Sequence, residues 1–434
     1  MSQVERPAAR ARAEGQTWSG ERAERHLRSL ELFGMRFGLD RMRRMMTALG
    51  SPERRFRSIH VVGTNGKSST TRMIAAILER HGLRTGAYLS PHLVSYTERV
   101  QVQERDLPMH AFAAAVAHAA RAAERVNRTL AEDDHVTQFE LLTAAAFWAL
   151  AEHDVEVAVI EAGLGGRYDA TAVIDSSVAV LSNVGLEHTR WLGPTVRDIA
   201  AEKLAVVRPG TMLALGADLH PDALEVARAV AAERDAQIVT APAGDDAAFQ
   251  RRNFALARVA AEAYLRDAGV VLDEQAVRDA AAHVSVPGRM HVLDRDPLIV
   301  LDGAHNPDAV TALVQSLPEV LAAPTGTRPL ALVMGVLEDK DAASMLRQLL
   351  PLCAKAWFTA PPSARALSPA ALQSLARQLG FEETTCDSSP RRALARAREW
   401  ARAYDGEDAP AAVLATGSVY LVGDLLAESK REAV

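Results

Sequence analysis

The segment Gly63–Ser69, with the sequence GTNGKSS, combines the residue types that bind phosphate groups. Glycines let backbone N–H groups turn towards phosphate oxygens, and the start of a helix adds positive potential. Lys67 brings a full positive charge for the β- and γ-phosphates of a nucleotide. The commonest P-loop spacing would place its first glycine at the position of Val61, so we interpret the segment as a P-loop variant. The alternative is a glycine turn that caps a helix and leaves Lys67 in solvent.

Polar side chains follow two apolar runs that we expect to be neighbouring strands. Glu161 follows the run 155–160, and Asn183 and His188 follow the run 178–181. Because the carboxyl ends of parallel strands line one crevice, Glu161 and His188 should converge near the P-loop. A nucleotide triphosphate needs a divalent ion with hard oxygen or nitrogen ligands, which these residues can supply. Alone, each would be an ordinary polar residue at a strand end.

Two further segments carry candidate chemistry. Residues 161–171, EAGLGGRYDAT, contain glycines that allow close backbone approach and an arginine, Arg167, that can hold an anion. Their spacing does not match the dinucleotide fingerprint G-x-G-x-x-G, so a nicotinamide cofactor is not favoured. Residues 302–307, DGAHNP, place Asp302 and His305 after another apolar run. They form either a capped turn or a second part of the nucleotide site.

Alternating strand and helix signals must position these residues. The predicted strands are 58–62, 85–89, 155–160, 178–181, 211–215, 237–240, 298–301, 330–334, 356–359 and 412–415. The predicted helices include 21–35, 67–81, 109–130, 139–153, 307–317, 342–350, 369–379 and 391–404. Strands separated by helices of this length imply βαβ crossovers and parallel sheets.

The two series of strands predict an α/β fold with two domains. We expect a parallel-sheet P-loop ATPase domain, followed by a smaller, Rossmann-like α/β domain. The predicted segments are a mobile tail over 1–20, the ATP-binding domain over 21–284, a linker over 285–296 and the C-terminal domain over 297–434.

Composition narrows the class of protein. The 434-residue chain carries 49 Lys and Arg against 55 Asp and Glu, a formal net charge of −6 that argues against a nucleic-acid-binding surface over the whole molecule. Two cysteines, Cys353 and Cys386, cannot build a disulfide framework or a Cys-based zinc site, and they fit a reducing cytosol. We expect neither a signal peptide nor a membrane helix, because no uncharged apolar run reaches ~18–20 residues.

Together these segments resemble the folylpolyglutamate synthase/dihydrofolate synthase family of the Mur ligase superfamily. The resemblance covers nearly the whole chain, from Leu39 to about Gly423. The matching segments are GLDRM at 38–42, GTNGKS at 63–68, SPHL at 90–93, TQFE at 137–140, EAGLGGRYDAT at 161–171, EHTRWLG at 187–193, Glu202-Lys203, Asn253, PGR at 287–289, DGAHNP at 302–307 and GSVYLVG at 417–423. One motif alone is modest evidence, whereas the ordered set is specific.

The resemblance implies roles for residues that bind ATP and the metal. ATP phosphates would be bound by Gly63, Thr64, Asn65, Gly66, Lys67, Ser68 and Ser69, and ATP would also contact Asn253, Arg289 and Asp302. The Mg²⁺ ligands would be Ser90, Glu161 and His188. Lys203 would be carboxylated to a carbamate near this ion, and the resemblance also suggests a monovalent cation.

The resemblance also implies a substrate pocket and catalytic side chains. The pterin substrate would contact Leu39, Asp40, Arg41, Thr137, Gln138, Phe139, Tyr168, Asp169 and Ala170. The catalytic residues would be Lys67, Lys203 and His305, the last through contact with the incoming glutamate. The chain departs from the usual family pattern at Ser68, at Ala172 and after Lys203, and none of these departures is at a proposed metal ligand.

The implied activity is an ATP-dependent amide ligase. It would join L-glutamate to the carboxylate of dihydropteroate or a reduced folate through an acyl phosphate, and we expect both reactions. The protein would be a cytoplasmic monomer with small-molecule partners and with no nucleic-acid or membrane partner. Two alternatives stay open: a Mur-type ligase for a nucleotide-linked cell-wall precursor, and a P-loop regulatory NTPase. Segments 90–93 and 137–139 argue against the cell-wall ligase, and a regulatory NTPase would not need the DGAHNP segment.

Overall fold

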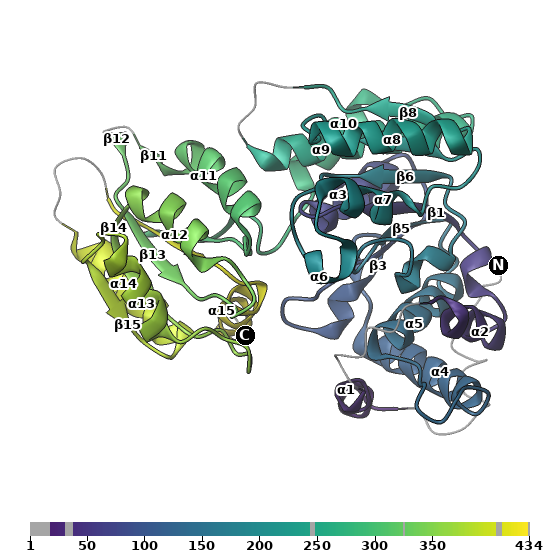
Figure 1. Cartoon of the computed structure of the whole chain (residues 1–434), viewed down its shortest axis with the longest axis horizontal. Coiled ribbons are helices and arrows are strands. Elements are labelled where there is room, and N and C mark those ends of the chain that lie inside the picture. The colour runs from purple at the N-terminus through teal and green to yellow at the C-terminus, as the bar shows by residue number, and fades with distance from the viewer. Residues whose placement is uncertain (1–17, 31–37, 244–247, 324–325, 405–409, 433–434) are drawn as a thin grey trace, which may run out of the picture. The chain divides into compact units, whose positions relative to one another are not determined.

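A computed structural model describes residues 18–30, 38–243, 248–323, 326–404 and 410–432 (Figure 1). Contacts among the residues divide the chain into two compact units. Unit 1 comprises Met1–Gly244 and Arg252–Val284, and unit 2 comprises Asp245–Arg251 and Ser285–Val434. Each unit contains one large, mostly parallel sheet, so the predicted α/β fold class is confirmed. Most of the predicted tail over 1–20 lies outside the described residues.

Unit 1 is built on an eight-stranded sheet. Its strands, in spatial order, are β4 (Arg105–Asp106), β3 (Val100–Val102), β2 (Thr85–Tyr88), β5 (Val157–Glu161), β1 (Arg57–Val62), β6 (Val178–Leu181), β7 (Met212–Leu215) and β8 (Gln237–Thr240). The strands from β2 to β8 in this order pair in parallel, and β3 and β4 add an antiparallel edge. The central strands are buried on both faces, which explains their unbroken apolar sequences.

The helices of unit 1 pack against this sheet or against one another. They are α1 (Gly20–Ser29), α2 (Asp40–Ala48), α3 (Lys67–Arg80), α4 (Met109–Asn127), α5 (Gln138–Glu152), α6 (Thr189–Leu192), α7 (Val196–Leu204), α8 (Pro221–Arg234), α9 (Phe249–Asp267) and α10 (Glu274–His283), with short 3₁₀ turns η1 (Pro52–Arg54), η2 (Tyr96–Arg99) and η3 (Ala170–Val173). Of these, α1 and α2 pack against α4 and α5. The first three residues of α9 group with unit 2. None of the described helices combines the length and the apolar character needed to cross a bilayer.

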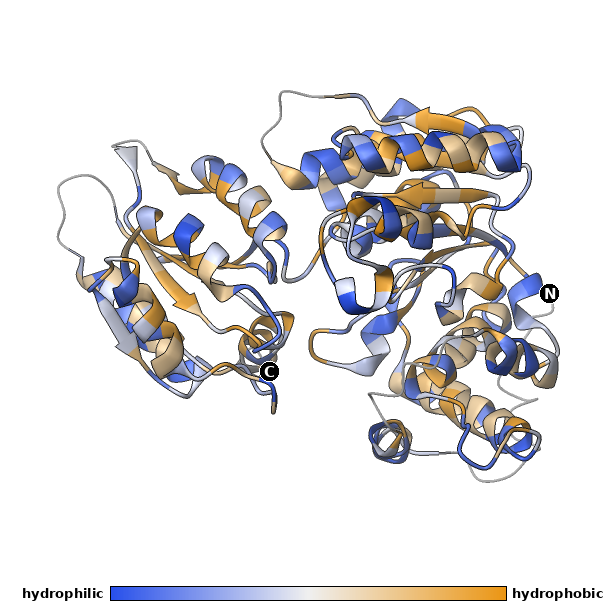
Figure 2. Ribbon diagram, in the orientation of Figure 1, coloured by the Kyte–Doolittle hydropathy of each residue, from blue (hydrophilic) through white to orange (hydrophobic). Residues whose placement is uncertain are grey.

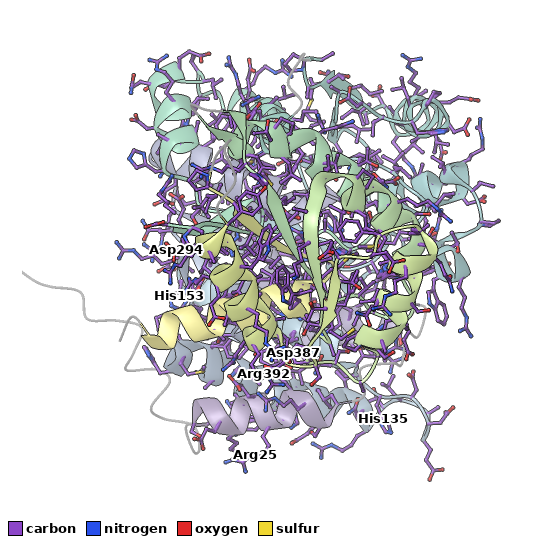
Figure 3. The ribbon with its side chains drawn as sticks, turned by 90° about the vertical axis from the view of Figure 1, so that its left-hand side faces the viewer. Arg25, His135, His153, Asp294, Asp387 and Arg392 are labelled. Carbon is purple, nitrogen blue, oxygen red and sulfur yellow. The ribbon has the colours of Figure 1, made fainter. Side chains whose placement is uncertain are left out.

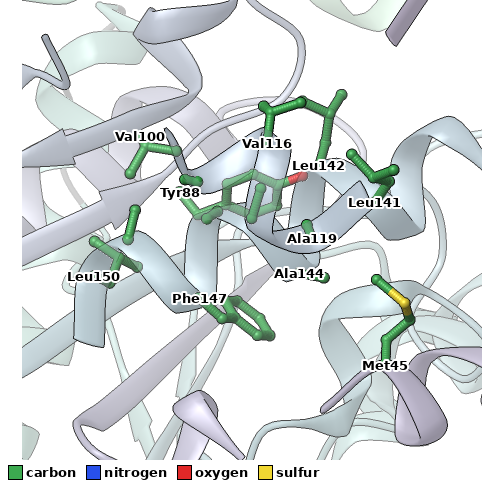
Figure 4. Close-up of a cluster of buried hydrophobic side chains, with 14 of the residues drawn as sticks. Met45, Tyr88, Val100, Val116, Ala119, Leu141, Leu142, Ala144, Phe147 and Leu150 are labelled. Carbon is green, nitrogen blue, oxygen red and sulfur yellow. The ribbon is translucent and has the colours of Figure 1, made fainter. Parts of the chain in front are cut away.

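The largest core of unit 1 lies where α4 and α5 pack against the sheet (Figure 4). The two helices are rich in alanine, whose small side chains let helix backbones approach closely. The rings of Tyr88 and Phe147 fill the space beneath them, with centroids 6.3 Å apart in an edge-on arrangement. Figure 2 shows the strands of the sheets as mainly apolar. This core holds the β2 and β5 ends, and therefore the residues that follow them, in place.

Unit 2 is built on a six-stranded sheet with the order β15 (Thr384–Cys386), β14 (Cys353–Phe358), β13 (Leu330–Met334), β16 (Ala412–Thr416), β10 (Leu298–Leu301) and β9 (His291–Arg295). Its other elements are α11 (Pro307–Leu321), β11 (Ala322–Ala323), β12 (Gly326–Thr327), α12 (Ala342–Leu349), η4 (Leu350–Leu352), α13 (Pro369–Gln378), α14 (Pro390–Ala403) and α15 (Val419–Glu432). Asp387 fixes the start of α14 because it accepts hydrogen bonds from Ser389 N and Arg392 (Figure 3).

The structure corrects two local expectations. The helix predicted over 21–35 ends at Ser29, because Leu30 has an extended backbone; residues 31–37 lie outside the described part. The predicted linker over 285–296 contains β9, which pairs antiparallel with β10 at the sheet edge. A short, half-exposed edge strand lacks the apolar run that marks a buried one.

Candidate active site

The P-loop connects β1, in the centre of the unit 1 sheet, to the start of α3. Gly63 and Gly66 have φ angles of 150° and 83°, in the range that L side chains rarely adopt. Gly66 is the N-cap of α3, and α3 begins at Lys67. The N–H groups of the first turn of α3 have no partner within the helix. The loop therefore ends in a helix N-terminus of the kind that binds anions.

Two lysines converge on one carbonyl group of this loop. Lys67 Nζ donates to the carbonyl oxygens of Gly63 and Thr64, each at 3.1 Å. Lys203, on α7, donates to the same Gly63 oxygen at 2.8 Å and is 4% exposed. Burial, followed by the charge of Lys67, lowers the pKa of Lys203 to about 7. Part of Lys203 is therefore an uncharged, nucleophilic amine at neutral pH.

This lowered pKa predicts a pH-dependent stability. An unfolded Lys203 would hold its proton up to about its usual pKa of 10.5, whereas the folded residue loses it near pH 7. Between these values the unfolded state binds more protons, so the free energy of unfolding should rise with pH. In CO₂-free buffer we expect wild type to gain up to about 4 kcal/mol relative to Lys203→Met between pH 7 and pH 10, measured by denaturant unfolding. Lys355→Met is the control, and parallel pH profiles for wild type and Lys203→Met would contradict the prediction.

Glu161 lies at the end of β5, beside the P-loop, and is 1% exposed. Its Oε1 accepts a hydrogen bond from Ser68 Oγ at 2.8 Å, and its Oε2 accepts one from Ser90 N at 3.0 Å. Ser68 is on α3 and Ser90 follows β2, so three segments that are distant in the sequence meet at one carboxylate. Parallel pairing of β5 with both β1 and β2 produces this meeting.

His188 follows β6, which pairs with β1 on the side opposite to β5. It has a left-handed backbone with φ of 52° and is the N-cap of α6. Its Nε2 lies 3.7 Å from Glu187 Oε1. The charge of Glu187 opposes the lowering of the Lys203 pKa, and Lys203 shares the Gly63 carbonyl oxygen with Lys67 of the P-loop. The structure thus places His188 and Glu161 after the two strands that flank β1.

The donor set around Glu161 fits a divalent ion. The Glu161 carboxylate and the hydroxyl groups of Ser68 and Ser90 offer hard oxygen ligands. Glu161 already accepts hydrogen bonds from Ser68 Oγ and from the backbone N of Ser90. Within the described residues, no three His, Cys, Asp or Glu side chains form a metal cluster on their own. The ion would therefore need hydroxyl groups, water or phosphate oxygens to complete its ligands, as Mg²⁺ commonly does beside a nucleotide.

Asn253, on α9, is packed against the P-loop. A Cβ atom added at Gly66 would lie 2.6 Å from Asn253 Oδ1, and the φ of 83° also disfavours any residue with a side chain at this position. The structure therefore brings the predicted nucleotide residue Asn253 to Gly66, the N-cap of α3, from a distant part of the sequence.

The other predicted nucleotide residues lie in unit 2. Asp302 is 2% exposed, and its carboxylate accepts hydrogen bonds from Met290 N and Ala304 N, each at 2.8 Å. Burial raises the pKa of Asp302, and the charge of Arg289 opposes this rise. Arg289 also packs on Gly303, where an added Cβ atom would lie 3.0 Å from its Nη1. Asp302 therefore connects the PGR turn to the DGAHNP segment.

His305 is oriented by its own loop. Its Nδ1 lies 2.8 Å from the Gly303 carbonyl oxygen, a contact that holds the ring against its own loop. The next residue, Asn306, is the N-cap of α11 and accepts a hydrogen bond from Ala309 N at 2.8 Å. The DGAHNP segment is thus both a capped helix start and a rigid support for His305.

Several predicted substrate residues use their side chains to build local structure. Thr137 forms a capping box with Glu140 at the start of α5. Gln138 donates to the Leu27 carbonyl oxygen at 2.6 Å. Arg41 is buried, and its Nε donates to both carboxylate oxygens of Glu140 at 3.1 Å. These side chains position α2 and α5, which limits what they can offer to a ligand.

Asp169 and Ala170 belong to the turn after the glycine-rich segment. Asp169 is buried and accepts hydrogen bonds from Leu164 N at 2.7 Å and Thr171 N at 3.0 Å. Burial raises the pKa of Asp169, and hydrogen bonds, the largest from the Thr171 side chain, oppose the rise. Phe139 packs against Gly163, where an added Cβ atom would lie 2.5 Å from the ring.

The remaining predicted substrate residues differ in exposure. Tyr168 is exposed, and Asp40 is an exposed partner of Arg44 on α2, at 2.7 Å. Leu39, half-buried, is the N-cap of α2. Tyr168 and Asp40 therefore lie at the surface, unlike the buried side chains of Arg41, Gln138 and Asp169.

Sequence reasoning missed two residues that contact the site. Arg99, on η2, is buried and donates to Ser90 Oγ at 3.4 Å and to His92 Nδ1 at 3.0 Å. Ser182, after β6, donates to the Asn65 carbonyl oxygen at 2.6 Å. Neither residue lies in a motif with known spacing, so only their partners in the folded chain reveal them.

Family models and curated relatives assign the chain to the same family of ligases. The Mur ligase middle domain matches residues 61–259, and the Mur ligase glutamate ligase domain matches residues 288–419. A folylpolyglutamate synthase of Lacticaseibacillus casei is 34% identical, over 87% of this chain and 92% of that protein. The dihydrofolate synthase/folylpolyglutamate synthase of Escherichia coli is 33% identical, over 80% of this chain and 81% of that protein.

Solved structures extend the similarity to the fold. Mycobacterium tuberculosis folylpolyglutamate synthase, complexed with ADP and AMPPCP, has a TM-score of 0.85 and 29% identity, covering 95% of this chain and 99% of that one. E. coli FolC in complex with DHPP and ADP has a TM-score of 0.82 and 28% identity, covering 97% and 100%. A bifunctional enzyme of Yersinia pestis with AMPPNP and a Mn ion has a TM-score of 0.80 and 28% identity, covering 96% and 99%.

Proposed function

Because the chain belongs to the folylpolyglutamate synthase/dihydrofolate synthase family of Mur ligases, an ATP-dependent ligase family, we propose that it joins L-glutamate both to dihydropteroate and to reduced folates. The observation that supports this most directly is the meeting of Lys67, Ser68 and Glu161 at the start of α3. That arrangement suits phosphoryl transfer, which needs positioning and charge neutralisation more than covalent chemistry from the protein.

The reaction requires activation of a carboxylate, because its oxygen is a poor leaving group. The substrate carboxylate attacks the γ-phosphorus of ATP, the bond to ADP breaks, and an acyl phosphate forms. The amine of glutamate then attacks the acyl carbon, phosphate leaves, and the amine loses a proton. We propose that Lys67 and the first N–H groups of α3 hold the phosphates, with Asn253, Arg289 and Asp302 as further ATP contacts.

We propose that Mg²⁺ is the divalent ion, held by Glu161, Ser90 and His188, with Ser68 beside it. When bound, the ion neutralises negative charge on the phosphates. The protein's own contribution is to keep a buried carboxylate in place, since Ser68 and Ser90 N both donate to Glu161. For the substrates, we propose that Phe139, Tyr168 and Leu39 contact the pterin, supported by Asp40, Arg41, Thr137, Gln138, Asp169 and Ala170. His305 is the proposed contact for the incoming glutamate.

We also propose that Lys203 is carbamylated, because burial lowers its pKa to about 7 and part of the amine is therefore uncharged and able to add CO₂ with loss of a proton. Depleting CO₂ from the buffers should lower the ligase rate, and adding bicarbonate should restore it. Lys203→Arg keeps a positive charge but does not form a carbamate under these conditions, so its residual activity should not respond to bicarbonate. Lys355→Arg should respond as wild type does, and a bicarbonate response in Lys203→Arg would rule out the carbamate at this residue.

The direct test offers purified protein ATP, Mg²⁺ and glutamate, first with dihydropteroate and then with a reduced folate. ADP and phosphate should appear only when glutamate and a pterin carboxylate are both present. ATP turnover that is independent of glutamate would contradict the proposal. Activity with only one of the two pterin substrates would restrict the function to that reaction. We further propose that the protein is a cytoplasmic monomer with no nucleic-acid partner. Light scattering of the purified protein tests the monomeric state.

A further inference from the structure

The first half of the P-loop is bound by protein groups rather than left open. Thr64 N donates to the Asn183 carbonyl oxygen at 3.0 Å, and Asn65 N donates to Asn183 Oδ1 at 2.8 Å. The Asn65 carbonyl oxygen accepts a hydrogen bond from Ser182 Oγ at 2.6 Å. Both peptide N–H groups that precede Gly66 in this half therefore already have acceptors.

The partners all come from residues 182–185, which follow β6 directly. Besides the bonds from Ser182 and Asn183, Gly185 N donates to Thr64 Oγ1 at 3.0 Å. The residues 182–185 are fixed in turn, since Ser182 N donates to the Val62 carbonyl oxygen at 3.0 Å. This segment thus holds the loop along its length from Val62 to Asn65.

The P-loop and the segment 182–185 are closely packed, so no side chain fits between them at Gly63. A Cβ atom added at Gly63 would lie 2.0 Å from Ser182 Oγ and 3.2 Å from the Asn183 carbonyl oxygen. On the other side, a Cβ atom added at Gly216, after β7, would lie 2.2 Å from the Ser182 carbonyl oxygen. Segment 182–185 is therefore enclosed between the P-loop and the end of β7.

These hydrogen bonds leave different parts of the P-loop for different partners. In P-loops generally, backbone N–H groups of the glycine-rich turn surround the phosphates. Here the N–H groups of Thr64 and Asn65 are engaged, so the phosphates are left with the first turn of α3 and Lys67. We infer that Ser182 and Asn183 are positioning residues for nucleotide binding, which fix the loop so that its phosphate contacts begin at the α3 N-terminus. This inference rests on the proposed function, because it takes the loop as the ATP site.

The test measures binding of ADP and of adenosine to Ser182→Ala and Asn183→Ala by calorimetry. Each change removes one neutral hydrogen bond to the loop, so we expect ADP affinity to fall about three- to tenfold. Adenosine lacks phosphates, so its affinity should not change, and the KM for glutamate should stay near the wild-type value. Ser182→Thr retains a hydroxyl donor and should bind ADP as wild type does.

Matched controls exist in the same unit. Ser177 precedes β6, and its Oγ donates to the Ser58 carbonyl oxygen at 3.4 Å, far along the strand from the P-loop. Asn127 Oδ1 accepts a hydrogen bond from Val136 N at 2.9 Å, at the end of α4. Ser177→Ala and Asn127→Ala therefore remove the same kinds of bond without touching the loop, and both should leave ADP binding unchanged.

The outcomes separate this inference from the proposed function. ADP affinities of the two variants equal to those of their controls, or equal losses for ADP and adenosine, would overturn the positioning role alone. A wild-type protein that binds neither ADP nor ATP would overturn both. Selective loss of ADP affinity, with ligase activity recovered at saturating ATP, would support both.

Discussion

Lys67→Ala should abolish glutamate-dependent ATP turnover, with a loss of at least about 10²–10³-fold in kcat. Lys67 is the one side chain of the P-loop that brings a full positive charge to the phosphates, and removing a positioned group that stabilises developing charge typically costs this much. The loop itself should survive, because Lys203 still donates to the Gly63 carbonyl oxygen and alanine is a strong helix former at the start of α3. Steady-state ADP release measures the effect.

Lys355→Ala is the matched control for this change. Lys355 lies in β14 of unit 2, where its Nζ is 5.5 Å from the Trp357 ring centroid. Turnover in this variant should stay near the wild-type rate. If Lys67→Ala kept a tenth or more of the wild-type turnover, with its melting temperature unchanged, Lys67 would not be a catalytic residue.

Glu161→Gln should have a comparably large effect, because it removes the charge of the proposed metal ligand while preserving its shape. A glutamine amide can still accept from Ser90 N through its oxygen and donate to Ser68 Oγ through its nitrogen, so the two hydrogen bonds persist with reversed polarity at Ser68. Folding should therefore be little affected. We expect the rate to fall about 10²–10³-fold and the Mg²⁺ concentration for half-maximal activity to rise.

Glu156→Gln provides the comparison for Glu161→Gln. Glu156 precedes β5 at the opposite end of the strand, where its Oε2 accepts a hydrogen bond from Arg84 N at 2.6 Å. Its replacement should leave both the rate and the Mg²⁺ dependence unchanged. An unaltered Mg²⁺ dependence in Glu161→Gln would remove Glu161 from the list of metal ligands.

The buried strands were the most predictable part of the fold. The runs 178–181, 298–301 and 330–334 match β6, β10 and β13 at both ends, because strands covered on both faces must be apolar throughout. The edge strands β4, β9 and β15 were not predicted, and neither was β3, which pairs with β4. They are short and partly exposed, so their sequences carry little of this pattern.

In the candidate site, too, features made by consecutive residues could be predicted, whereas features that depend on contacts between distant residues could not. The P-loop is a local signal, since glycine, lysine and the start of α3 are consecutive in the chain. The resemblance to a family supplied roles for Thr137, Gln138 and Asp169, yet their side chains cap helices or brace turns. Residue type and motif identify a position, but they do not reveal whether its polar atoms are already used by neighbours.

Sequence alone determined the order of the elements, the phosphate-binding loop and the strand ends at which chemistry is placed, because these depend on side-chain periodicity and on residues close together in the chain. Only the tertiary structure decided that Ser68 and Ser90 N meet at Glu161, that Lys67 and Lys203 share one carbonyl oxygen, and that segment 182–185 holds the P-loop. These contacts depend on which strands lie side by side. Strand order is set by the packing of the whole sheet, and no short stretch of sequence encodes it.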